Sequence, residues 1–180
     1  IGTTLLKHLE KDVYAADLIV SVLRTALETE YFYPKPSFPG KSKDGEAKDM
    51  IGISLFTEIV KTMPAIKELL NYSGEIELKE KVGIKMFHVL RWIFLTCKTK
   101  LYFLPPKFAF PILDNKRTKK RCYQFMTLPG SAEQESIFTQ LKNKYGSRLL
   151  FFGAPTERWY SIFRNGLMNL NVAQLLPPDS

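Results

Sequence analysis

Histidine and cysteine are sparse in this chain, with two of each, and they do not cluster in the sequence. His8 and His88 lie far apart in the sequence, with no Cys, Asp or Glu at metal-ligand spacing around them. Cys97 and Cys122 form no CxxC pair, and Pro129-Gly130-Ser131 is too short for a glycine-rich phosphate loop. The spacing therefore predicts no metal site and assigns no catalytic residue by a Ser-His-Asp or Cys-His pattern.

The clearest charge feature is a basic run, which consists of Lys116, Arg117, Thr118, Lys119, Lys120 and Arg121. Between Lys98 and Arg121 there are eight Lys or Arg and one acid, so this segment carries +7 of the chain's net charge of +8. The run is either a contact for nucleic acid, an acidic protein surface or an import receptor, or simply a solvated hairpin tip. No aromatic residue interleaves inside it, which counts against a base-stacking platform.

The first hundred residues are predicted to be helical. Apolar residues recur at helical spacing over 5–30, 50–61 and 76–97. Pro64 interrupts the second helix, and a short helix is expected to stop at Gly74 as a C-terminal cap. Residues 34–48, rich in Pro and Gly, are expected to form a loop.

From about residue 100 the pattern becomes mixed. Short apolar runs predict strands at 101–104, 108–113 and 122–128, the last two joined across a charged turn near Asp114-Asn115. A capping box that starts at Ser131 predicts a helix ending at Gly146. Its expected buried face comprises Ile137, Phe138, Leu141 and Tyr145.

A second strand–helix unit follows. The apolar run Leu149–Phe152 predicts a strand buried on both faces. Pro155 suits the start of a helix whose inner face would carry Trp159, Ile162 and Phe163, with Gly166 as its cap. The predicted fold class is therefore α+β.

Length and composition bound the class of protein. The chain has 180 residues with 45% hydrophobic content, which is enough for one domain or two small ones with a sizeable core. No stretch reaches the roughly 20 apolar residues of a membrane span. Two isolated cysteines favour free thiols and an intracellular, reducing compartment, cytoplasmic or nuclear. Because the first residue is Ile1, the simplest interpretation is a processed or trimmed portion of something longer.

The passage from Tyr145-Gly146-Ser147 through Arg164-Asn165-Gly166-Leu167 resembles the start of the poly(ADP-ribose) polymerase (PARP) catalytic domain. It is most similar to the mono-ADP-ribosylating branch with a helical N-terminal region. Gln124-Phe125-Met126, Ala15-Ala16-Asp17-Leu18 and the Trp92-Ile93 helix agree with that branch. The resemblance implies a helical region over 1–100, followed over 101–180 by the first strands and helices of an ADP-ribosyltransferase-like fold.

The resemblance also implies a degenerate NAD site. In the family a His bonds the ribose 2′-hydroxyl, a Gly backbone holds the nicotinamide carboxamide, and a Ser follows. These positions correspond to Phe152, Gly153 and Ala154. Phe152 has no donor or acceptor, and Ala154 lacks a hydroxyl, so only the backbone role of Gly153 can survive. The later Tyr and Glu of the family have no counterpart before Ser180.

The sequence thus favours a PARP-like protein that is catalytically inactive as given and acts as a structural or interaction subunit, with no cofactor. The alternative is the N-terminal part of an active NAD-dependent mono-ADP-ribosyltransferase that modifies proteins. A protein partner or larger assembly is expected to dock near 149–152 and the helix after Pro155. The basic residues Lys116, Arg117, Lys119, Lys120 and Arg121 are candidate contacts for an acidic surface or nucleic acid.

Overall fold

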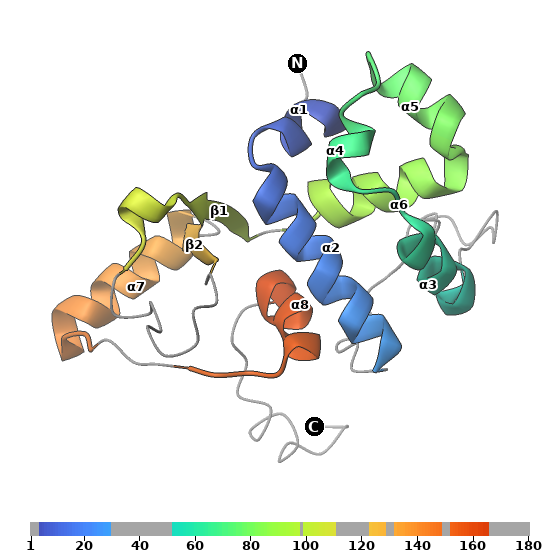
Figure 1. Cartoon of the computed structure of the whole chain (residues 1–180). Coiled ribbons are helices and arrows are strands. Elements are labelled where there is room, and N and C mark those ends of the chain that lie inside the picture. The colour runs from blue at the N-terminus through green and yellow to red at the C-terminus, as the bar shows by residue number, and fades with distance from the viewer. Residues whose placement is uncertain are drawn as a thin grey trace.

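The computed structural model describes residues 4–29, 52–97, 99–110, 123–128, 132–148 and 152–165. Helices dominate these residues, and a two-stranded antiparallel sheet accompanies them (Figure 1). The α+β class is therefore confirmed. The elements are α1 (Leu5–Glu10), α2 (Val13–Glu28), α3 (Ile53–Thr62), α4 (Ile66–Leu69), α5 (Glu75–Val82), α6 (Ile84–Leu95), β1 (Lys100–Leu104), the 3₁₀ turn η1 (Pro106–Phe108), β2 (Gln124–Leu128), α7 (Ala132–Tyr145) and α8 (Thr156–Asn165).

Helix α2 runs through the middle of the described structure. Figure 1 shows α3 to α6 on one side of it, α8 alongside it, and the sheet with α7 on the other side. Its buried residues contribute much of a single hydrophobic core, which also takes side chains from α1, α3, α4, α5, α6, β1 and α8. Phe56 of α3 meets Trp92 of α6 edge-on in this core, with ring centroids 5.4 Å apart.

The single helix predicted over 5–30 is wrong, because Asp12 divides it. The Asp12 Oδ1 atom accepts a hydrogen bond from the Ala15 amide at 2.9 Å and so caps the start of α2. A short polar side chain that bonds the nearby backbone competes with helix continuation. The Oδ2 atom of the same carboxylate accepts the Phe103 amide at 2.6 Å, which ties β1 to the start of α2.

The helix predicted over 76–97 is likewise two helices, α5 and α6. Gly83 separates them with φ 82° and ψ 155°, a conformation that is essentially restricted to glycine. Gly74 is not the end of a helix as predicted. Its carbonyl accepts the Leu78 amide at 3.0 Å, so it caps the start of α5, whereas α4 already ends at Leu69.

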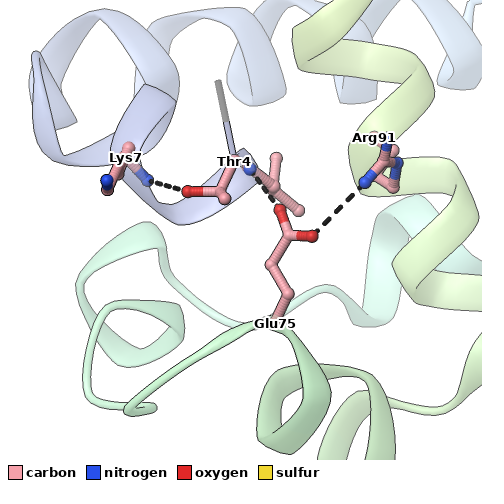
Figure 2. A network of polar contacts seen from close by, with 5 residues as sticks. Thr4, Lys7, Glu75 and Arg91 are labelled. Carbon is pink, nitrogen blue, oxygen red and sulfur yellow. Dashed lines mark hydrogen bonds and ion pairs between the residues drawn. The ribbon is translucent and has the colours of Figure 1, made fainter. Parts of the chain in front are cut away.

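A carboxylate on α5 joins three helices, as Figure 2 shows. The Oε1 atom of Glu75 accepts a hydrogen bond from the amide of Leu5, the first residue of α1. Its Oε2 atom forms an ion pair with Arg91 of α6 at 3.3 Å (Figure 2). The first amides of a helix have no partner within the helix, so an external carboxylate there satisfies a donor and matches the helix dipole.

The strand predicted at 101–104 is present in β1, and the strand predicted at 122–128 is present from Gln124 to Leu128, but the predicted pairing is not. Strand β2 pairs with β1, in the register Tyr102↔Met126 and Phe103↔Phe125. Of the strand predicted at 108–113, Phe108 belongs to η1 and residues 109–110 are not in a strand, while the rest lies in the segment 111–122, outside the described part of the chain. Leu101 is buried in the helical core, and Phe103, two residues further along the same strand, packs on the half-exposed Tyr14 of α2 with ring centroids 4.5 Å apart.

Helix α7 exists as predicted and ends at Gly146, which adopts φ 76° and donates to the Lys142 carbonyl at 2.8 Å. Its predicted buried face is wrong. Every α7 side chain that the structure describes is exposed, and its apolar residues do not join the core. The predicted loop at 34–48 lies outside the described residues, and the domain boundary near 100 stays a prediction.

Replacing Asp12 with Ala removes the α2 cap and the acceptor for the Phe103 amide together. We expect Asp12→Ala to lower the free energy of unfolding by about 2 kcal/mol, from one lost cap and one unsatisfied donor. Asp12→Asn keeps an amide oxygen as a capping acceptor and should cost clearly less. Urea unfolding followed by circular dichroism measures both. Equal losses for the two variants would contradict the capping role.

Replacing Gly83 with Ala tests the break between α5 and α6. A Cβ at this position would meet nothing within 4 Å, so any cost comes from the backbone conformation. We expect a loss of about 1–3 kcal/mol in the free energy of unfolding. Gly52→Ala is the matched control, because its φ is −65° and its Cβ would also meet nothing within 4 Å. An unchanged unfolding midpoint for Gly83→Ala would show that the break is not a glycine requirement.

Candidate functional site

The candidate NAD-site positions lie just before helix α8. Phe152, Gly153 and Ala154 have no regular secondary structure, and α8 begins at Thr156. The amide of Arg158 donates to the Pro155 carbonyl at 3.1 Å and forms the first turn. The predicted strand at Leu149–Phe152 falls largely outside the described residues, and Phe152 itself is not in a strand.

Phe152 was predicted to be a core aromatic at a strand end, and this is wrong. Its side chain is 57% exposed. The ring meets Trp159 of α8 edge-on, with centroids 6.3 Å apart, so it packs on the outside of the helix. The position corresponding to the family's His thus presents an apolar ring to solvent.

The two residues after Phe152 also offer little polar chemistry. The carbonyl of Ala154 accepts a hydrogen bond from the Trp159 indole N–H at 3.1 Å, and this bond holds the segment onto α8. Gly153 is exposed, does not adopt a positive φ, and a Cβ there would meet nothing within 4 Å. The protein's own conformation therefore does not require glycine at 153.

The opposite face of α8 is buried against α2. Tyr160 and Phe163 lie in the hydrophobic core, and the Phe163 ring packs 5.5 Å from Trp159. Burial raises the pKa of the Tyr160 hydroxyl far above its ordinary value, although the Arg164 guanidinium partly offsets this. The inner face of α8 was predicted to consist of Trp159, Ile162 and Phe163. Phe163 is buried and the other two are half-buried, while Tyr160 is the buried residue that the sequence did not indicate.

Polar contacts fix the end of α8 to the end of α6. The Arg164 guanidinium lies 4.2 Å from the centroid of the Trp92 ring and donates to the Thr96 hydroxyl at 3.2 Å. The Thr99 hydroxyl donates to the Phe163 carbonyl. Cys97 lies beside this junction as a free thiol, and burial raises its pKa. A thiol whose pKa is raised is a poor nucleophile.

The remaining sequence predictions concern ligands and charge. Among the described residues, no group of three or more His, Cys, Asp or Glu could hold a metal ion. His8 contacts Phe94, and burial together with Lys11 lowers its pKa. In the same part of the chain, no helix is long and apolar enough to cross a membrane. The basic run Lys116–Arg121 and Cys122 lie outside the described residues.

Sequence reasoning did not predict that the apolar face of α7 is exposed. The apolar residues of α7 lie exposed: Ile137, Phe138, Leu141 and Tyr145. Their helical spacing was recognised, but spacing alone shows only that a helix has an apolar face, and not which neighbour covers it. Phe108, Phe110 and Tyr123 are also exposed, near the two ends of the segment 111–122.

Comparison with known proteins agrees with the resemblance to PARPs. No protein-family model matches the chain, and no solved structure matches it. Over 165 residues, 84% of the chain, it is 26% identical to protein mono-ADP-ribosyltransferase PARP8 of Mus musculus and to that of Homo sapiens. The chain spans only 18% of the length of these curated relatives. Over most of its own length, the chain is therefore similar to a PARP mono-ADP-ribosyltransferase.

Proposed function

We propose that this PARP-like chain is catalytically inactive as it stands and acts as a structural or interaction subunit. The observation that carries the proposal is the exposed, apolar Phe152 at the position where the family has His. A ribose hydroxyl facing this ring would lose water without gaining a partner, which costs roughly 1–3 kcal/mol. With Ala at 154, the neighbouring hydroxyl is absent as well.

The burial of α8 supports a structural role for the same segment. Its inner face joins the helical core through Tyr160 and Phe163, and its last turn holds Thr96 through Arg164. These contacts are made by side chains of the helix itself. They do not require residues 152–154 to bind a ligand. The motif's helix therefore has a complete packing role without any chemistry at its N-terminus.

The exposed face of α7 supports the interaction role. Ile137, Phe138 and Leu141 are each about half exposed, along one side of a helix that does not join the core. Complete burial of such a side chain from full exposure contributes roughly 1.5–3 kcal/mol, so covering the exposed half contributes at most about half of that for each residue. A contiguous apolar face of this kind marks a protein interaction surface. The sequence placed the docking surface near α8, whereas the exposed apolar residues favour α7.

The second candidate function is the front part of an active, NAD-dependent mono-ADP-ribosyltransferase that modifies proteins. The names of the two curated relatives favour it, as does the small share of their length that this chain spans. In that case the α7 face would be covered by the remainder of a catalytic domain, and not by a separate protein. Phe152 argues against this candidate, because the substitution remains whatever covers α7.

The chain is expected to have no useful affinity for NAD. Isothermal titration calorimetry with NAD, and with a nicotinamide mimic, should give no binding heat in the micromolar range. Saturating NAD should also leave the melting temperature unchanged, since a ligand stabilises only the state that binds it. Micromolar binding to this chain alone would overturn the inactive interpretation and favour the second candidate.

The α7 face is expected to drive association. Size-exclusion chromatography with light scattering should show one of two results. Either the wild-type chain self-associates as its concentration rises, or it elutes together with a bound protein. Leu141→Lys should abolish this with little change in the melting temperature, because α7 contributes nothing to the core. Asn143→Lys, on the same helix but about 200° further around it, is the matched control. A wild-type chain that stays monomeric at high concentration and unfolds cooperatively would contradict the proposal.

A further inference from the structure

Helix α7 carries two acids at its start and two bases at its end. Its first turn contains Glu133 and Glu135, and its last turn contains Lys142 and Lys144. Each acid lies at least seven residues from each base, whereas ion pairs along one helix need a separation of three or four residues. The order suits the helix dipole, but the dipole does not decide on which side of the helix each charge lies.

The four charges flank the exposed apolar face of α7, which consists of Ile137, Phe138, Leu141 and Tyr145. At about 100° per residue, Glu133 and Lys144 lie about 20° apart around the helix, along one edge of this face. Glu135 and Lys142 also lie about 20° apart, along the opposite edge. Each edge of the apolar face therefore has an acid near the start of the helix and a base near its end.

This pattern is self-complementary about a twofold axis that crosses the helix. The acid–base pairs on the two edges share one midpoint along the sequence, between Phe138 and Thr139. Ile137 and Leu141 are centred on Thr139, within one residue of that point. A twofold axis here would turn a second α7 antiparallel to the first, with acid opposite base on both edges and Ile137 opposite Leu141. A parallel pair would instead bring acid to acid and base to base, which is repulsive.

We propose that the partner of the α7 face is a second copy of this chain, docked antiparallel through α7. This inference rests on the proposed interaction function and names the partner of that face. The apolar side chains supply the favourable burial, and the charges on the edges fix the orientation by penalising the parallel arrangement. Because a pair of short helices makes a small interface, the dissociation constant should be roughly micromolar or weaker.

Analytical ultracentrifugation of charge-reversed variants of the whole chain tests the proposal. Glu133→Lys with Glu135→Lys makes α7 basic at both ends, and Lys142→Glu with Lys144→Glu makes it acidic at both ends. At low salt, each variant alone should dimerise on the order of 10- to 100-fold more weakly than the wild type, because every edge pair becomes a like-charge pair. An equimolar mixture of the two should restore dimerisation as a heterodimer, which variants with an unfolded α7 would not do. Rising salt should reduce these differences.

Ser136→Lys with Asn143→Lys is the matched control, because both positions lie on the side of α7 opposite its apolar face. This variant should dimerise as the wild type does. The orientation follows from a variant that carries all four reversals, which should dimerise with itself. Antiparallel docking predicts that it forms no heterodimer with the wild type, because ends of like charge would meet, whereas parallel docking predicts that it does.

The outcomes separate this proposal from the proposed function. A wild-type chain that does not dimerise but elutes with a different protein would overturn the second copy as partner and leave the interaction function in place. A monomer without any bound protein would overturn both. Dimerisation that the charge reversals leave unchanged, or a mixture of the two variants that stays monomeric, would overturn the antiparallel pairing.

Discussion

The packing of α8 against α2 is the contact on which the rest of the structure depends. Tyr160 and Phe163 bring the last described helix into a core that otherwise comes mainly from the first hundred residues. Arg164 then holds α8 to α6 by lying over Trp92 and donating to Thr96. Because the inner face of α8 is committed in this way, the segment before it must lie at the surface, and Phe152 is exposed as a result.

The two-stranded sheet depends on the same core. Two paired strands alone are at best marginally stable in water. Here Leu101 is buried in the core, Phe103 packs on Tyr14 of α2, and Phe125 packs against the same cluster. Asp12 adds a direct hydrogen bond from the cap of α2 to the backbone of β1. The helices therefore cover the inner face of the sheet, whereas Tyr102 and Met126 of its outer face remain partly exposed.

The sequence predicted most elements correctly but not their ends or their neighbours. Periodicity identified helices on both sides of Asp12 and Gly83, because both halves of each pair share an apolar pattern. The breaks depend on one cap and one backbone conformation, which periodicity does not report. The exposure of the α7 face and of Phe152 was not predicted, for another reason. An apolar side chain indicates that burial is favourable, but only the tertiary structure shows whether a neighbour is present.

The candidate site illustrates how similarity to an enzyme and the loss of its chemistry that we propose could occur together. The packing of α8 requires an apolar inner face and a helix of about ten residues, which Tyr160 and Phe163 supply. The family's chemistry instead requires polar groups before the helix, and no core contact constrains those positions. At 152 the side chain is 57% exposed, and at 154 the hydrogen bond to Trp159 is made by the backbone carbonyl and not by the side chain. On the proposed function, substitutions at these two positions would remove a ligand site at little structural cost, because function resides in the site and not in the fold.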